Sequence, residues 1–411
     1  MKILQVNCVY QKGSTGKIVY DIHKCLCAEG IESIVCYGRG KKINAPNVYK
    51  FCSEFESKVY HLLNKFGWLM YAVCPIATQR LIRIIKKEKP DVVHLHCING
   101  FCVNIYELLK FLGRSRIKTI VTHHAEFFYT GNCGHAYECT KFQHESGCYD
   151  CHILKEATGS DIVDRTSKGW LLMRRAFSSF KDGDLLFTAV SPWVAGRSVL
   201  SPICNKFECK FVTNGLDTSL FHPATPNAIA TIKSQLPHPE QRVILHVSAS
   251  FSTNKDSIKG GYYIKQLAEM MPHYQFVVVA SSILDLDGLP DNIYIWGRSK
   301  GQEELAALYS TADLTVIASK RETFSMVVAE SLCCGTPVVG FESGGPESIG
   351  LKDCTCFVEF GNTEKLKKAV SVFVNKKWEA TAIANLAALA YSKETMAMGY
   401  IRAYKELTHE S

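Results

Sequence analysis

The sequence has no apolar run long enough to cross a membrane as a helix. Such a helix needs roughly 18 uninterrupted apolar residues, and the longest candidate, residues 68–77, reaches about half of that length. The start of the chain, residues 1–7, turns polar too soon for a secretory signal peptide. The sequence also has no internal repeat and no low-complexity tract. We therefore expect a cytoplasmic protein, with any membrane contact limited to the surface.

Two nucleotide-binding signatures are missing as well. Gly13 and Gly16 follow the first predicted strand and open a helix, but Gln11 stands where a P-loop needs glycine and Ile18 where it needs Ser or Thr. The G-x-G-x-x-G pattern is also absent there, which counts against an NTPase and an NAD-binding domain. Two interpretations of this loop stay open: a helix N-terminus whose amides face a ligand, or a tight turn without one.

The composition is that of a packed protein with a mild positive charge. The 411 residues are 47% hydrophobic and 21% charged, which predicts two or three globular domains. Lys and Arg number 47 against 39 Asp and Glu, a formal net charge of +8. This excess permits an anionic partner such as a nucleotide or a membrane surface. Because the basic residues are scattered along the chain, we do not expect nucleic-acid binding.

Both halves of the chain alternate short β-branched runs with helical patterns, which predicts two parallel sheets covered on both faces. The predicted strands are residues 3–6, 34–37, 92–95, 119–122, 186–190 and 210–213 in the first half, and 243–248, 276–280, 293–296, 314–318, 337–340 and 356–358 in the second. The predicted helices include 16–28, 76–87 and 168–180, then 262–271, 302–309, 325–334 and 364–375. A proline-rich stretch at residues 223–239 is interpreted as the linker.

These patterns predict an α/β protein with two doubly wound, Rossmann-like domains that face a central cleft. The expected boundaries are 1–220 for the N-terminal domain, with a cysteine-rich loop at 131–152, and 221–390 for the C-terminal domain. Residues 391–411 are expected to form a helix that packs back on the N-terminal domain.

The strongest group of polar residues lies at residues 321–339. Glu322 falls in the loop after a predicted strand, Ser325 is placed to cap the next helix, and Glu330 lies about a turn and a half into it. Both carboxylates therefore lie at one elbow, beside the positive end of the helix dipole. Carboxylates accept hydrogen bonds from paired hydroxyls, so this elbow suits a sugar or ribose beside a diphosphate. A glycine turn at Gly344 and Gly345 begins another helix.

Glu322 and Glu330, with seven residues between them, and residues 334–339 and 344–347 resemble the E-x7-E signature of retaining glycosyltransferases of family 4, which have the GT-B fold. Further segments resemble landmarks of that family in the same order: residues 93–96, 121–124, 191–192, 214–223 and 259–261. The match spans nearly the whole chain. Residues 13–16 and the cysteine-rich insertion resemble the branch that builds bacterial capsular polysaccharides and exopolysaccharides such as colanic acid.

The resemblance implies that the N-terminal domain, 1–220, is the acceptor side and that the C-terminal domain, 221–390, binds the nucleotide-sugar. It also implies a role for each matched residue. Lys259 faces the donor diphosphate, Glu330 holds the ribose hydroxyls, and Glu322 holds the hydroxyls of the donor sugar. His124 lies beside the sugar, which makes His124, Lys259 and Glu322 the implied catalytic residues. Ala125 stands where the family has Asp, with Glu126 next to it. The implied donor-binding residues are Gly13, Gly16, Lys259, Glu322, Glu330, Gly344 and Gly345.

The implied function is transfer of a sugar, with retention of configuration, from a UDP- or GDP-sugar to an oligosaccharide or polyprenyl-diphosphate-linked acceptor. No catalytic metal is required. Asp285-Leu286-Asp287 has the D-x-D spacing of the other glycosyltransferase fold, but we interpret it as a solvated turn. The alternatives are a nucleotide-sugar epimerase or glycan phosphorylase of the same fold and, more remotely, a zinc-stabilised nucleic-acid-binding protein.

Four of the 18 cysteines lie in the stretch 131–152: Cys133, Cys139, Cys148 and Cys151. In a reducing compartment, four thiolates on a short loop suit a closed, structural zinc site. A disulfide pair and free thiols are the alternatives. The sequence also pairs aromatic residues with basic ones at residues 68–89 and 168–175, which predicts contact with an anionic membrane surface. Core helices with solvated basic faces would give the same pattern.

Overall fold

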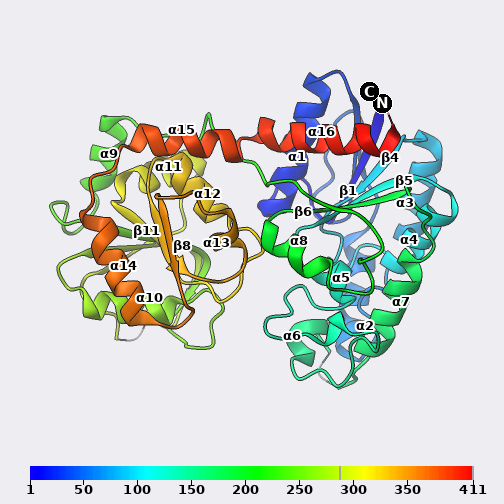
Figure 1. Ribbon diagram of the computed structural model, residues 1–411, viewed down its shortest axis with the longest axis horizontal. Coiled ribbons are helices and arrows are strands. Elements are labelled where there is room, and N and C mark those ends of the chain that lie inside the picture. Colours follow the sequence, from blue (N-terminus) through cyan, green and yellow to red (C-terminus); the bar gives the residue numbers. More distant parts are fainter. Residues whose placement is uncertain (161, 287, 410–411) are drawn as a thin grey trace. The chain divides into compact units, whose positions relative to one another are not determined.

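The computed structural model describes residues 1–160, 162–286 and 288–409. The chain forms two compact units (Figure 1): an N-terminal unit of Met1–Thr213 joined by the chain from Met396 onward, and a C-terminal unit of Asn214–Thr395. The proline-rich stretch lies within the C-terminal unit and contains a helix of its own, α9 (Pro226–Lys233), which Thr225 caps. Among the described residues, no helix has both the length and the hydropathy of a membrane span.

The N-terminal unit is built on a seven-stranded, all-parallel sheet with the strand order β3-β2-β1-β4-β5-β6-β7. Near-continuous runs of Ile, Val and Leu form the central strands because both faces of the sheet are covered. The strands are β1 (Lys2–Asn7), β2 (Glu32–Tyr37), β3 (Val48–Lys50), β4 (Val92–Leu95), β5 (Lys118–His123), β6 (Leu185–Ala189) and β7 (Cys209–Phe211).

Helices cover both faces of this sheet (Figure 1). The last helix, α16 (Lys393–Thr408), packs with α1 (Gly13–Ala28) against buried residues of the central strands, among them Ile3, Val92 and Ile120. The opposite face carries α3 (Pro75–Glu88), α4 (Ile105–Arg114) and α7 (Thr166–Phe177). The other helices of this unit are α2 (Glu54–Lys65), α5 (Phe127–Thr130), the 3-10 helix Lys141–Gln143, α6 (Leu154–Thr158) and α8 (Pro192–Ser198).

The C-terminal unit has a six-stranded parallel sheet with the order β10-β9-β8-β11-β12-β13. Its strands are β8 (Val243–Ser252), β9 (Gln275–Leu284), β10 (Ile293–Gly297), β11 (Leu314–Ile317), β12 (Val338–Phe341) and β13 (Thr355–Val358). One face packs on α10 (Gly261–Met270) and α14 (Thr363–Asn375), which contribute Ile264, Leu267, Leu366 and Val370 to its core. The remaining helices are α11 (Gln302–Thr311), α12 (Met326–Cys333), α13 (Gly345–Ile349) and α15 (Ala380–Tyr391).

The predicted α/β class and the two doubly wound parallel sheets are therefore confirmed. Most apolar side chains of the two segments that predicted a membrane surface pack inside the N-terminal unit. Tyr71, Val73, Trp170 and Met173 are each no more than 3% exposed, whereas Trp68 and Leu171 are 47% and 39% exposed. The burial of the first four residues favours the alternative, core helices with solvated basic faces, for most of each segment.

Candidate active site

Three loops of the C-terminal unit meet at the carboxyl edge of its sheet. Glu322, in the loop after β11, donates its backbone N–H to the Ser343 carbonyl at 3.0 Å and accepts the Gly345 N–H at 2.8 Å. The Lys320 N–H bonds the Ile258 carbonyl at 2.8 Å, which adds the loop after β8. Open α/β sheets bind their ligands at this edge.

Lys259 and Glu322 are in direct contact at this edge. The Lys259 Nζ lies 2.7 Å from Glu322 Oε1, and the two side chains are 24% and 22% exposed. An ion pair this open to solvent contributes little to stability. Gly260 has φ +73°, and a Cβ there would overlap the Ala318 carbonyl, so glycine is what lets the loop pack this closely. The arrangement presents a cation and a carboxylate side by side to a ligand with anionic and hydroxyl groups.

Glu330 lies on α12 and is oriented by a buried tyrosine. The Tyr309 hydroxyl, from α11, donates to Glu330 Oε2 at 2.9 Å. Tyr309 is wholly buried, and this burial, together with the neighbouring carboxylate, raises the pKa of Tyr309 well above its ordinary value. The phenol therefore stays protonated and acts as a fixed donor to the carboxylate. The sequence does not reveal this contact, since a tyrosine in an apolar helix carries no signal of its partner.

The glycine turn before α13 is held by hydrogen bonds within the protein. Glu347 accepts the Ser343 N–H at 2.9 Å and the Gly344 N–H at 2.7 Å, while the Gly345 N–H bonds Glu322. A Cβ on Gly345 would lie 2.5 Å from the Phe324 nitrogen. These glycines therefore allow the close approach of two loops, and their amides already have partners.

One detail of the predicted elbow is wrong. Ser325 stands at the N-cap position of α12, but within the described part of the chain its side chain makes no capping hydrogen bond. Its φ of +81° explains this, because a capping serine needs an extended backbone to reach the amides of the first turn. The positive φ instead turns the chain sharply between Glu322 and the helix.

In the N-terminal unit, Gly13 and Gly16 lie in the first turn of α1, which begins three residues earlier than predicted. Gly13 has φ +65°, and a Cβ on Gly16 would lie 3.1 Å from Val9 Cγ2, so both glycines serve the tight connection from β1. The side chain of Asn7, the last residue of β1, donates to the Val9 carbonyl at 2.7 Å and so stabilises the same connection. The loop thus lies at the carboxyl end of its own sheet.

His124 belongs to a buried group of histidines at the ends of β4 and β5. Its Nε2 lies 3.1 Å from His96 Nδ1, and His96 Nε2 lies 3.3 Å from the Gln5 side-chain oxygen. His94 bonds the Tyr404 hydroxyl of α16 at 2.6 Å. Burial lowers the pKa of His124 to about 3, so its ring is neutral near pH 7. A neutral imidazole at this position offers a hydrogen bond rather than a charge.

Glu126 does not replace the family's missing aspartate. It is fully buried, and its carboxylate accepts hydrogen bonds from Arg197 Nε at 2.7 Å, the Tyr129 hydroxyl at 2.8 Å and the Ala136 N–H at 2.7 Å. These partners fix the start of the cysteine-rich loop. Glu126 is therefore a structural residue. It does not supply His124 with the acidic neighbour that the aspartate provides in the family.

Asp285 fits the turn that the sequence suggests. It directly follows β9 with φ +55°, and its carboxylate accepts the Ser252 hydroxyl at 2.9 Å while its carbonyl accepts the Thr253 hydroxyl at 2.7 Å. Asp285 thus supports the loop that carries Lys259. Asp287, the other acid of the D-x-D spacing, lies outside the described residues.

The zinc prediction is not supported. Cys133, Cys139, Cys148 and Cys151 all line one small cavity of about 20 Å³, but no group of three or more His, Cys, Asp or Glu side chains in the described residues is placed to hold a metal ion. Burial raises the pKa of Cys148 to about 12, and its thiol donates to the Thr130 carbonyl at 3.6 Å. All 18 cysteines lie within the described residues and none of them forms a disulfide there, so the disulfide alternative is not supported either.

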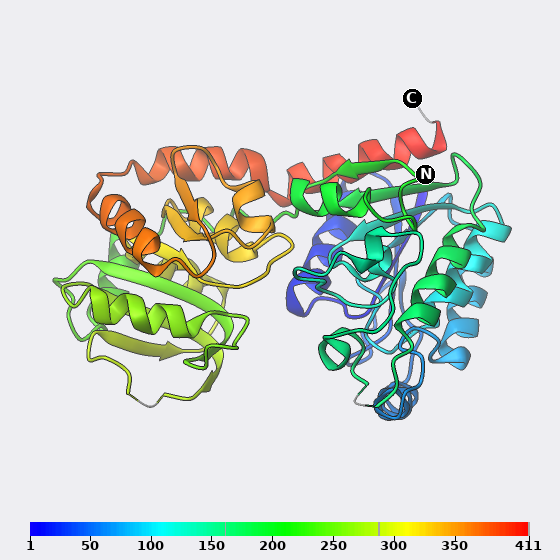
Figure 2. The same ribbon diagram turned by 60° about the horizontal axis from the view of Figure 1, so that its bottom comes forward.

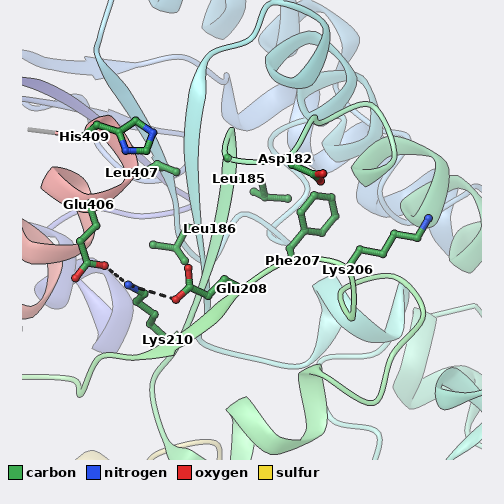
Figure 3. A pocket seen from close by; sticks show the side chains of 11 residues that line it. Asp182, Leu185, Leu186, Lys206, Phe207, Glu208, Lys210, Glu406, Leu407 and His409 are labelled. Atoms are coloured by element: carbon green, nitrogen blue, oxygen red, sulfur yellow. Dashed lines mark hydrogen bonds and ion pairs between the residues drawn. The ribbon is translucent and has the colours of Figure 1, made fainter.

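A larger cavity in the N-terminal unit lies away from these residues (Figure 3). It has about 280 Å³ and is bounded by Leu185 at the start of β6, by the segment before β7 and by the end of α16. Lys210 bridges Glu208, at 3.3 Å, and Glu406 across it. The cavity is therefore at the amino edge of the sheet, opposite the edge where Gly13 and His124 lie, and it carries charges of both signs.

The structure thus gathers the predicted residues at two places. Lys259, Glu322 and Gly345 are joined by direct contacts in the C-terminal unit, with Glu330 on the helix that follows. Gly13, Gly16 and His124 occupy the carboxyl edge of the N-terminal sheet. Two doubly wound parallel sheets, each with polar residues and glycine-built loops at its carboxyl edge, have the architecture of the GT-B class of glycosyltransferases.

Comparison with known proteins agrees with this class. Residues 15–201 match the family described as Glycosyltransferase Family 4, and residues 241–376 match the family described as Glycosyl transferases group 1. The chain therefore belongs to the glycosyltransferases, with one such domain in each unit.

Individual relatives cover the full chain at low identity. WcaC of Escherichia coli (strain K12), named for glycosyl transfer in colanic acid biosynthesis, is 20% identical over 99% of this chain and 100% of its own. Sucrose-phosphate synthase of Thermosynechococcus elongatus has a TM-score of 0.69 at 15% identity and covers 100% of both chains. HepE of Anabaena, solved with UDP, has a TM-score of 0.68 at 14% identity over 98% of this chain and 99% of its own. These structures establish the GT-B fold.

Proposed function

We propose that this chain transfers a sugar from a nucleotide-sugar donor to a glycan or lipid-linked saccharide acceptor, with retention of configuration, in the assembly of a bacterial surface polysaccharide. The observation that carries the proposal is the contact of Lys259 with Glu322 at the loops after β8, β11 and β12, with Glu330 on the next helix. The name of WcaC supports the polysaccharide role. The HepE structures with UDP and with UDP-glucose make a UDP-sugar the first donor to test.

Each residue has a proposed part in donor binding. Glu330, with one oxygen fixed by Tyr309, accepts hydrogen bonds from the ribose hydroxyls. Lys259 leaves Glu322 to face the diphosphate, and Glu322 then accepts from hydroxyls of the donor sugar. His124, neutral through burial, hydrogen-bonds the sugar without adding charge. Gly344 and Gly345 shape the loop at the sugar rather than donating their amides to it.

The transfer needs no covalent nucleophile from the protein. The acceptor oxygen forms a bond to the anomeric carbon as the bond from that carbon to the diphosphate oxygen breaks. The proton of the acceptor hydroxyl passes to the departing diphosphate on the same face. Lys259 stabilises the charge that develops on this leaving group, the kind of preorganised electrostatic effect that dominates many active sites. No step is assigned to a metal.

A thermal-shift panel of UDP-, GDP- and ADP-sugars tests the donor, because a ligand that binds the native state raises the unfolding temperature. We expect one nucleotide class to shift the unfolding midpoint by several degrees. Nucleotide release that requires an added saccharide acceptor would then establish transfer. Donor conversion without an acceptor would identify an epimerase instead, and the absence of any shift across the panel would contradict the proposal.

A further inference from the structure

The helix α2 has the reverse of the usual amphipathic pattern. The two residues that it buries most deeply, Ser57 and Asn64, are polar and at most 2% exposed. Its large apolar residues face solvent instead: Phe55 is 79% exposed and Leu62 56%, and Phe66, directly after the helix, is 70% exposed. Helices on globular domains bury their apolar stripe, so this one presents a surface for something outside the unit.

The exposed residues form one stripe. Phe55, Val59, Leu62 and Phe66 follow each other at intervals of four, three and four residues, which places them on one side of the helix. We call these four residues, together with Leu63, the α2 apolar face. In Figure 2 the helix is seen nearly end-on at the lower edge of the N-terminal unit.

Neighbouring segments extend this surface. A Cβ on Gly67 would lie 2.8 Å from Val163 Cβ, so the exposed residues Ile162 and Val163 border the end of α2. Glu56 accepts the backbone N–H of Ile76 at 3.1 Å, which brings that 66% exposed side chain beside the start of α2. Soluble monomers rarely expose contiguous apolar patches of this extent unless the patch binds something.

The charges around the face are arranged for an anionic partner. Both acids of α2 have partners within the unit: Glu56 caps α3, and Glu54, whose side chain is 41% exposed, forms ion pairs with Arg39 at 2.9 Å and Lys50 at 3.2 Å. Lys58 and Lys65, in contrast, are exposed. The outward charge contributed by the helix is therefore positive.

A basic groove continues from this surface. Trp68, which is 47% exposed, donates its indole N–H to the Ala72 carbonyl at 2.7 Å, and Ala72 lines a groove of about 540 Å³ between α3, α4 and α7. Lys86, Lys110 and Arg114 line the same groove, against one acid, Glu107, which bonds Gln79. An apolar stripe with an aromatic border beside clustered cations matches the layering of acyl chains under anionic headgroups.

We propose that the α2 apolar face docks the N-terminal unit on an anionic phospholipid bilayer. The apolar side chains enter the headgroup boundary, and Lys58 and Lys65 contact the phosphate groups. The α2 apolar face itself lies before the segments that suggested membrane contact in the sequence, whereas Trp68 and Lys86 belong to one of those segments. The inference does not depend on the donor chemistry proposed above.

Flotation of the full-length protein with vesicles tests the docking. We expect binding to phosphatidylglycerol-containing vesicles, at least tenfold weaker binding to pure phosphatidylcholine, and a loss of binding as salt is raised. The Leu62→Gln/Phe66→Gln variant should bind at least tenfold more weakly, with an unchanged unfolding temperature since both side chains are exposed. The matched control is Leu386→Gln/Leu389→Gln on α15, whose side chains are 54% and 75% exposed and which should bind as the parent does.

Trp68 supplies a second readout. Anionic vesicles should shift its fluorescence to the blue and expose it to quenching by brominated lipids, and both effects should disappear in Trp68→Phe. Equal flotation of parent and Leu62→Gln/Phe66→Gln would overturn the proposal, as would flotation indifferent to lipid charge. A concentration-dependent dimer that this variant abolishes, without vesicle binding by the parent, would show that a second copy of the chain covers the face instead.

Discussion

At the scale of single residues, the candidate donor site depends on side chains that hold other side chains. Tyr309 fixes one oxygen of Glu330, Glu347 closes the glycine turn, and Asp285 supports the loop of Lys259. The spacing of Glu322 and Glu330 is local, so the sequence predicted the elbow that carries them. The supporting contacts join residues far apart in the chain, and the pattern of a single sequence does not reveal such pairs.

Removal of the Tyr309 hydroxyl should weaken nucleotide binding while the fold is kept. In Tyr309→Phe the carboxylate of Glu330 loses a fixed donor, a charge-assisted hydrogen bond of about 1.5–3 kcal/mol, of which a part is expected to appear in the affinity for UDP. Isothermal titration should show roughly three- to tenfold weaker binding, and Glu330→Ala a larger loss. An affinity equal to that of the parent would show that Tyr309 does not orient the site.

Lys259→Ala should reduce turnover more than donor affinity. Charge on the diphosphate grows as the sugar departs, so the loss of this cation costs most in the transition state. We expect kcat to fall roughly 100-fold, with a much smaller change in KM. Lys255→Ala, an exposed lysine in the same loop, serves as the comparison and should lose far less. A kcat of Lys259→Ala within twofold of the parent would rule out this role.

At the scale of helices and strands, the sequence predicted the elements whose apolar residues are buried, and it missed elements with half-buried or outward-facing apolar residues. The central strands were predicted because both of their faces are apolar. The edge strand β3 has only three half-buried residues, and α2 has an outward apolar face, so neither follows the usual pattern. The zinc prediction finds no support among the described residues, because the spacing of cysteines fixes neither the path of the loop nor the directions of its thiols.

The histidines at the ends of β4 and β5 should make the N-terminal unit sensitive to acid. Burial lowers the pKa of His123 to about 3, and within the described residues neither of its ring nitrogens has a hydrogen-bond partner. The unfolded chain binds this proton near pH 6.5 and the folded chain does not. The free energy of unfolding is therefore highest above pH 6.5, where His123 is neutral in both states, and it falls as the pH drops from 6.5 toward 3.

Urea unfolding at pH 7 and pH 5 checks this expectation. The His123→Phe variant keeps the stacking on Phe187, at 4.8 Å between ring centres, and removes the titrating group. It should lose less stability between the two pH values than the parent, by about 2 kcal/mol at most. His238→Phe, an exposed position, should lose as much as the parent does. Equal acid losses in parent and His123→Phe would mean that His123 is already protonated in the folded state.

At the scale of the whole molecule, each unit has its own sheet and its own core, and α16 returns the chain to the N-terminal unit. The proposed donor residues Lys259, Glu322 and Glu330 belong to the C-terminal unit, whereas the proposed membrane face belongs to the N-terminal unit. This division predicts that nucleotide binding and vesicle binding are separable by substitution.

The central claim is that a nucleotide-sugar donor binds at the carboxyl edge of the C-terminal sheet. Hydrogen exchange of the full chain, measured by mass spectrometry with and without saturating UDP, tests it most directly because it locates the ligand without an acceptor. We predict slower exchange in peptides that cover residues 253–261, 319–330 and 342–350. Protection confined to the N-terminal unit, or to the cavity bounded by Lys210 and Glu406, would contradict the account.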